Sequence, residues 1–178
     1  MKELDELRAR LPEAARDIKI NLQTVLKPGT LSLEQVLGVA LACAHTTRCA
    51  LLIRALESVE GVGEAIKADA HAAAVLMAMN NVYYRSRHLL GGVIAEKSPR
   101  LRMQRMASAA NRGDFELCCF AVSALAGCPT CLLAHEASCL RHGLSDEHVH
   151  EALRIASVIN AAAVALACEP GSSAQLEA

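Results

Sequence analysis

Apolar residues recur three and four positions apart along most of the chain, which is the spacing of one face of an α-helix. The stretch from Leu33 to His45 shows this spacing, and Ser32 before it is a residue type that caps helix N-termini. Segments with the same pattern span residues 4–15, 17–24, 33–45, 49–59, 64–84, 101–110, 115–126, 128–141 and 145–168. Glycine, proline and asparagine between them mark turns. The pattern predicts helices joined by short loops.

Residue types also predict where some of these helices begin and end. Asp114 precedes the segment over 115–126 and is expected to cap it. Ser145, followed by two acidic residues, is expected to begin the last helix. From Pro170-Gly171 onward we expect a frayed tail.

Composition narrows the pattern to an all-α fold in one domain. The 178 residues are 53% hydrophobic but only 2% aromatic, and tryptophan is absent. A core must then be built from Ala, Leu, Val, Ile and Met, which favours closely packed helices over sheets. The length only modestly exceeds that of a typical domain, so we expect a single all-helical domain over residues 1–178.

The two halves of the chain carry a weak internal repeat. Residues 44–51 align with residues 126–133, which sets Cys49 against Cys131. This predicts a duplicated helical unit. The two copies would span about residues 33–85 and 115–168.

Charge and hydropathy argue against two classes of partner. The formal net charge is -1 and the pI is near 6.6, so no basic field attracts nucleic acid. Residues 1–20 mix charged and apolar side chains without a secretory signal, which predicts a cytoplasmic protein. Residues 117–134 are uncharged, but Gly127 and Pro129 interrupt them. We therefore expect two core helices that meet at a turn, and no membrane span.

The candidate chemistry centres on Cys128-Pro129-Thr130-Cys131 and on His135. Proline is tolerated in a first helical turn, so the motif predicts a helix that begins at its own cysteines. Unpaired N–H groups and the helix dipole favour a thiolate there, and only the thiolate is nucleophilic. His135 lies one turn after Cys131 on the same face, where it can take the proton of the thiol. The dipole favours activation of Cys128 and the base favours Cys131, so these residues alone leave that choice open.

Other uses of a Cys-x-x-Cys pair fit less well. A zinc site could use Cys128, Cys131, His135 and Cys139, but four tetrahedral ligands rarely come from successive turns of one helix. Covalent haem attachment requires histidine directly after the second cysteine, where this chain has Leu132. A thioredoxin fold requires strands, which the helical pattern does not supply. The remaining cysteines lack a partner at redox spacing and are expected to be core thiols.

Longer stretches around the motif resemble one protein family. They are Phe115-Glu116-Leu117, Phe120-Ala121-Val122-Ser123-Ala124, Gly127-Cys128-x-x-Cys131-Leu132-x-Ala134-His135-Glu136, Met79-Asn80-Asn81-Val82-Tyr83-Tyr84-Arg85, and the run from Leu11 to Lys19. In these residues the chain resembles the lipoyl-dependent alkyl hydroperoxidases of the AhpD family over nearly its whole length. The resemblance implies an all-helical subunit, commonly a homotrimer, that reduces organic hydroperoxides.

The resemblance also implies how electrons are supplied. In that family the active disulfide is regenerated by dihydrolipoamide, the lipoyl group of a dehydrogenase-complex subunit. The thiols can also pass electrons to a peroxiredoxin. We therefore expect no tightly bound cofactor and no metal.

Carried onto this sequence, the resemblance assigns four catalytic residues. It gives Cys131 as the cysteine that becomes a sulfenic acid, Cys128 as its resolving and proton-donating partner, and His135 with Glu116 as a proton relay. Glu116 taken alone would be interpreted as an exposed helix carboxylate. Some family members carry a second histidine between the cysteines, whereas this chain has Pro129-Thr130, which leaves proton transfer to the relay.

Two other functions remain open at this point. One is carboxymuconolactone-type decarboxylation on a related helical fold, and the other is a zinc-stabilised helical interaction module. Decarboxylation of that kind does not need two adjacent cysteines, and metal content would identify the zinc module. Residues 79–85 add two amides, two phenols and a guanidinium, which we interpret as groups that satisfy a buried helix end.

Overall fold

The computed structural model describes residues 2–103 and 111–168. In chain order the helices are α1 (Lys2–Arg10), the 3₁₀ helix η1 (Glu13–Ala15), α2 (Arg16–Val25), α3 (Leu33–Thr47), α4 (Ala50–Glu57), α5 (Glu64–Leu90), α6 (Gly92–Ala95), α7 (Arg112–Ala126), α8 (Pro129–Arg141) and α9 (Asp146–Ala167). No strand occurs within these two ranges, so the all-α prediction is confirmed. Most of the helix expected over 101–110, and the tail expected from Pro170, lie outside the described residues.

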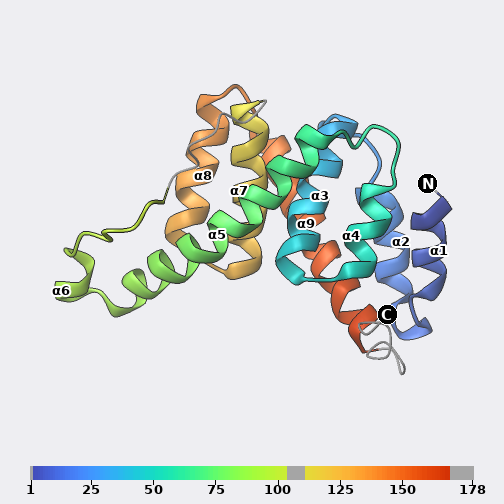
Figure 1. Ribbon diagram of the computed structural model, residues 1–178, viewed down its shortest axis with the longest axis horizontal. Helices are drawn as coiled ribbons and strands as arrows, with labels where there is room; N and C mark the ends of the chain where they lie inside the picture. The colour runs from blue at the N-terminus through green and yellow to red at the C-terminus, as the bar shows by residue number, and fades with distance from the viewer. Residues whose placement is uncertain (1, 104–110, 169–178) are drawn as a thin grey trace.

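The centre of the molecule is formed by α3 and α7, which pack on each other and each on α5 and α9 (Figure 1). On one side α2 packs on α9 and α1 packs on α4, and on the other side α8 packs on α5 and α7. The last turns of α5 and the short α6 extend away from this centre, at the left of Figure 1. As the composition suggests, the largest fully buried side chains are aliphatic, and they include Leu37, Leu41, Met77, Leu117 and Ile155.

The two central helices begin at side-chain caps, of which one was predicted. Ser32 and Gln35 form a reciprocal capping box at the start of α3, as expected for a serine at this position. The cap predicted at Asp114 is wrong. Asn111 Oδ1 accepts the N–H groups of Gly113 (2.9 Å) and Asp114 (3.3 Å), so α7 begins at Arg112, one turn earlier than predicted. The Asp114 carboxylate instead accepts a hydrogen bond from Gln35 Nε2 at 2.7 Å, which ties α7 to α3.

The end of α5 also differs from the prediction. The helix continues to Leu90, past the expected end at Tyr84, and stops where Gly91 adopts a positive φ of 57°. The polar residues 79–85 therefore lie within the helix and not at its terminus.

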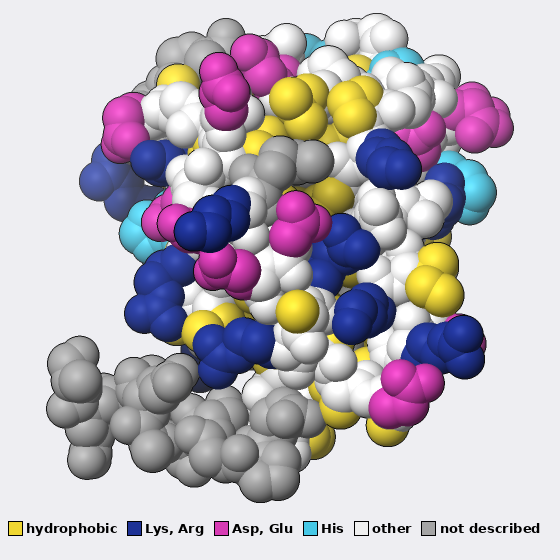
Figure 2. Space-filling view, turned by 90° about the vertical axis from the view of Figure 1, so that its right-hand side faces the viewer, with side chains coloured by type: hydrophobic (Ala, Val, Ile, Leu, Met, Phe, Trp, Pro, Cys, Tyr) yellow, Lys and Arg dark blue, Asp and Glu magenta, His cyan; other side chains and the backbone are white. Residues whose placement is uncertain are grey.

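The uncharged stretch over residues 117–134 is two helices, α7 and α8, that meet at Gly127, as predicted. One described helix, α9, has the length and mean hydropathy (1.4) of a membrane span. Half of its apolar window is buried inside the fold, and it packs on α2, α3 and α7, as a core helix does. On the described part of the face in Figure 2, basic and acidic side chains are interspersed.

The connections α3–α4 and α7–α8 have the same backbone geometry. The first helix of each pair ends at a left-handed residue, Arg48 (φ 58°, ψ 26°) or Gly127 (φ 61°, ψ 40°). The next residue, Cys49 or Cys128, is the N-cap of the second helix, and its N–H bonds a carbonyl five residues back. The geometry therefore pairs Cys49 with Cys128, whereas the sequence alignment pairs it with Cys131.

Candidate active site

Cys128 is the N-cap of α8, and Pro129 follows it as the first helical residue. The Cys128 sulfur accepts a hydrogen bond from the backbone N–H of Cys131 at 3.3 Å. The helix thus begins at its own cysteines, as the motif predicts, and one of its unpaired N–H groups points at a sulfur. Both cysteines are free thiols in this structure.

Cys131 lies inside the first turn of α8, where it is only 4% exposed. Its Sγ lies 4.0 Å from the backbone carbonyl of Asn80 in α5, to which the thiol donates. Burial, followed by the contact with Cys128, raises the pKa of Cys131 to about 12. The expectation that the helix N-terminus favours a thiolate is therefore not met at Cys131, where burial disfavours the charged form of the thiol. This thiol needs a base.

Glu116 is buried in α7, at 4% exposure, and is not the exposed carboxylate that its sequence position alone suggests. Its Oε2 lies 2.7 Å from His135 Nδ1, and its Oε1 lies 2.6 Å from a guanidinium nitrogen of Arg112. Burial alone would raise the pKa of Glu116, but the hydrogen bond and charge of His135, together with Arg112, outweigh it and lower the pKa. The carboxylate is therefore held ionised between two donors.

This contact orients the imidazole of His135. A carboxylate can only accept, so Nδ1 carries the hydrogen and Nε2 is left with its lone pair in the neutral ring. A carboxylate that orients an imidazole in this way serves base catalysis in unrelated folds. Among the described residues the ring bonds Glu116 and neither sulfur.

A cavity of about 450 Å³ lies between α5, α7 and α8, and we call it the thiol cavity. Its polar wall includes Asn80, Tyr84, Glu116, Cys131 and His135. Its apolar wall includes Leu76, Met77, Phe115 and Ala134. Cys128 is fully buried and does not line it. A molecule in the thiol cavity thus meets the Cys131 sulfur and the His135 ring, with apolar surface beside them.

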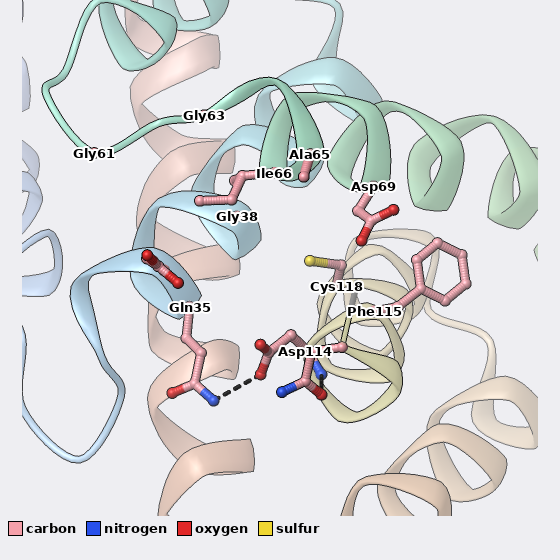
Figure 3. A pocket seen from close by; sticks show the side chains of 12 residues that line it. Gln35, Gly38, Gly61, Gly63, Ala65, Ile66, Asp69, Asp114, Phe115 and Cys118 are labelled. Carbon is pink, nitrogen blue, oxygen red and sulfur yellow. Dashed lines mark hydrogen bonds between the residues drawn. The ribbon is translucent and has the colours of Figure 1, made fainter. Parts of the chain in front are cut away.

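The four candidate zinc ligands do not converge. Within the two described ranges, no group of three or more His, Cys, Asp and Glu side chains is placed to hold a metal ion. Four of the thiols expected in the core are buried, namely Cys43, Cys118, Cys119 and Cys139, and burial raises the pKa of Cys43, Cys118 and Cys139. The expectation is wrong for Cys168, which is exposed, and Cys49 is half-buried. Cys118 faces a second cavity of about 440 Å³, formed where α3, the start of α5 and the start of α7 meet (Figure 3). No predicted catalytic residue lines that second cavity.

Two residues of the site were not singled out from the sequence. Arg112 precedes Glu116 by one helical turn, so the i, i+4 spacing of opposite charges could have indicated it. Asn80 was seen only as part of a polar helix end, and its place against Cys131 depends on how α5 packs on α8.

The chain is similar to two groups of known proteins. The profile of the carboxymuconolactone decarboxylase family matches residues 97–169. Over a longer range the chain is similar to curated proteins named alkyl hydroperoxide reductase AhpD. The one from Anaeromyxobacter sp. (strain K) is 52% identical over 170 residues, which cover 93% of this chain and 91% of the relative. The one from Rhodospirillum centenum is 40% identical, with 97% and 95% covered, and the one from Mycobacterium bovis is 39% identical, with 92% and 94% covered.

Proposed function

The chain belongs to the AhpD family of alkyl hydroperoxide reductases, and on this basis we propose that it reduces organic hydroperoxides to alcohols through Cys131 and Cys128. One observation carries the proposal for these residues. In the thiol cavity the Cys131 sulfur lies together with an imidazole whose free nitrogen is set by the Glu116–His135 contact of 2.7 Å.

The first step oxidises Cys131. His135 takes the proton of the thiol, and the resulting thiolate attacks the terminal oxygen of the hydroperoxide. The O–O bond breaks, an S–O bond forms, and the alkoxide takes the proton back from His135 and leaves as an alcohol. The sulfur is oxidised to a sulfenic acid and the peroxide is reduced by two electrons.

The second step uses Cys128. Its sulfur attacks the Cys131 sulfur, a disulfide forms, and the hydroxyl group leaves as water with the proton of the Cys128 thiol. Because Cys128 Sγ already accepts the N–H of Cys131 at 3.3 Å, the reacting residues are neighbours before oxidation. This proximity makes the step effectively unimolecular.

The electron donor and the assembly are carried over from the family resemblance. Dihydrolipoamide on a lipoylated dehydrogenase-complex subunit would reduce the disulfide by thiol–disulfide exchange, with a peroxiredoxin as a further acceptor of electrons. The protein would act in the cytoplasm and would assemble as a homotrimer. Light scattering, which measures the molar mass of the assembly, tests the trimer directly. No tightly bound cofactor is required by these steps.

A decarboxylase is the second candidate, since the carboxymuconolactone decarboxylase profile matches residues 97–169. That match covers less of the chain than the similarity to the peroxide reductases does. The cysteine pair also favours peroxide reduction, because decarboxylation of that kind does not use two adjacent thiols.

The test is hydroperoxide consumption by the purified protein with dihydrolipoamide as donor. Cys131→Ser and Cys128→Ser should both reduce turnover to background, while Cys168→Ser, which removes an exposed thiol, should leave it unchanged. A sulfenic-acid trap such as dimedone separates the roles of the two cysteines. After treatment with one equivalent of hydroperoxide, dimedone should label the Cys128→Ser variant and should not label the Cys131→Ser variant. Turnover that persists in both active-site variants would overturn the proposal.

A further inference from the structure

Two consecutive asparagines are buried in the middle of α5. Asn80 is 7% exposed and Asn81 is 3% exposed. The side-chain oxygen of each has no hydrogen-bond partner among the described residues. Of the two, only Asn80 lines the thiol cavity. Buried polar atoms are normally hydrogen-bonded, so an unpartnered acceptor on a residue that lines a reactive cavity requires an explanation.

The orientation of the Asn80 amide is determined by its other hydrogen bonds. Asn80 Nδ2 donates to the backbone carbonyl of Met103 at 3.2 Å and lies 3.9 Å from the sulfur of Met77. A flipped amide would bring its oxygen against the Met103 carbonyl, and two acceptors cannot bond each other. The atom without a partner is therefore the acceptor, Oδ1.

Asn80 also contacts the reacting sulfur through its backbone. The Cys131 thiol donates to the backbone carbonyl of Asn80. The Asn80 side chain therefore belongs to a residue whose own backbone contacts the nucleophile. Asn80, whose side chain has one spare acceptor, is among the residues that line the thiol cavity together with Cys131. A cavity lined in this way suits a ligand whose reacting end carries a hydrogen-bond donor.

We propose that Asn80 Oδ1 binds the substrate by accepting a hydrogen bond from the O–H group of the hydroperoxide. This inference rests on the proposed function. In a hydroperoxide the attacked oxygen is the one that bears hydrogen, so the bond holds that oxygen beside Cys131. As the O–O bond breaks and the S–O bond forms, the hydrogen stays on the attacked oxygen, and Asn80 keeps its bond to the sulfenic acid. Dialkyl peroxides have no such hydrogen, so Asn80 selects hydroperoxides over them.

The test uses the two half-reactions of a ping-pong enzyme, which steady-state kinetics separates. The value of kcat/KM for the hydroperoxide reports oxidation of the enzyme, and kcat/KM for dihydrolipoamide reports its reduction. Asn80→Leu keeps the size of the side chain and removes the acceptor. It should lower kcat/KM for the hydroperoxide about tenfold, as expected for one lost hydrogen bond, and change kcat/KM for dihydrolipoamide by less than about twofold.

Asn81→Leu is the matched control, because Asn81 is equally buried, also has an unpartnered Oδ1, and donates to the Val122 carbonyl away from the thiol cavity. It should not change the ratio of the two kcat/KM values. Asn80→Ala serves as a second variant that removes the acceptor without added bulk, in case the leucine disturbs folding. An unchanged hydroperoxide value in the Asn80 variants, or an equal fall in both half-reactions, overturns the inference. Absence of hydroperoxide turnover in the wild type instead overturns the proposed function.

Discussion

The α3–α4 and α7–α8 connections, one in each half of the molecule, share a backbone geometry but not a chemistry. In each half a capped fifteen-residue helix ends at a left-handed residue, and a cysteine then caps the next helix. When the two connections are matched at Cys49 and Cys128, the pairs that line up along the helices are Leu37 with Glu116, Leu52 with Cys131, and Leu56 with His135. All three leucines are fully buried. A cysteine at a helix N-cap is therefore not sufficient to form the site. The two connections differ in the side chains at these three matched positions, which are Glu116, Cys131 and His135 in the second half and leucine in the first.

Packing explains why the same positions are apolar in one half and polar in the other. In the first half α1 packs directly on α4, and Leu4 and Leu7 of α1 are buried. In the second half α8 packs on α5, where the thiol cavity lies between the helices. Close packing favours leucine at Leu52 and Leu56 of α4, whereas a cavity wall leaves room for a thiol and a base at the matching positions of α8. If the unit is duplicated, the second copy would thus have kept the backbone of this connection and exchanged the apolar side chains at these positions for polar ones.

The largest expected effect comes from making the second half like the first at one position. His135→Leu places leucine in α8 at the position that matches Leu56 of α4. It should lower kcat/KM for the hydroperoxide by about 10²- to 10⁴-fold, which is the usual contribution of a general base. Because the pKa of Cys131 is raised to about 12, the residual rate should follow the thiolate fraction and rise about tenfold per pH unit from neutral to alkaline pH.

The control for this prediction is His150→Leu, since the His150 side chain is 64% exposed on α9. Its rate and pH profile should match those of the wild type. A His135→Leu enzyme with the wild-type rate and profile would show that another group takes the proton of Cys131.

A smaller effect is expected at the two left-handed residues, which differ in type but not in backbone. Gly127→Ala forces a Cβ into a left-handed conformation, and should lower the free energy of unfolding by about 1–2 kcal/mol. A Cβ at Gly127 would meet no atom within 4 Å, so this effect comes from the backbone alone. Arg48→Gly should raise the free energy of unfolding by up to about 1 kcal/mol, because glycine adopts the left-handed conformation without strain. The gain is limited because glycine also increases the conformational entropy of the unfolded chain. Urea unfolding of the two variants measures both signs, and equal signs would contradict a shared geometry.

The smallest effect concerns a contact made from one half to the other. Glu151 of α9 accepts the backbone N–H groups of Thr30 (2.8 Å) and Leu31 (3.0 Å), just before α3. Slight burial alone would raise the pKa of Glu151, but these hydrogen bonds outweigh it and lower the pKa. A lowered folded-state pKa stabilises the fold above the unfolded pKa, and this stabilisation is lost as pH falls through the folded pKa.

Glu151→Gln should therefore reduce stability at neutral pH and have little effect in acid. The loss should be below about 1 kcal/mol, because the residue is only half-buried and solvent screens its charge. Urea unfolding at neutral and acid pH measures it. Glu60→Gln, at an exposed turn, should show no such difference, and a Glu151→Gln penalty that persists in acid would exclude the ionic contribution.

The helices and the cysteine motif could be predicted from the sequence because both depend on short-range spacing. Apolar periodicity gave the helical segments, and Ser32 and Pro129 marked two of the helix starts. The error at Asp114 has a local cause. Asn111 and Asp114 are both good capping residues, and only the packing of α7 on α3, which engages Asp114 with Gln35, decides between them.

The properties of the site depend on packing between helices and could not be predicted from spacing. Glu116 has the sequence context of a surface carboxylate, and it becomes buried because α8 covers that face of α7. The raised pKa of Cys131 has the same origin, since α5 lies over the first turn of α8. Family resemblance singled out these residues, but it did not indicate their protonation.

The two thiols of the motif lie within a single helical turn, and this spacing sets how redox state relates to folding. A bond between Cys128 and Cys131 closes one of the shortest loops a chain can form, and the conformational freedom it removes from the unfolded chain grows with loop length. Oxidation therefore adds little to overall stability, and reduction takes little away. A dithiol at this spacing can take up and release two electrons while the free energy of unfolding stays nearly constant.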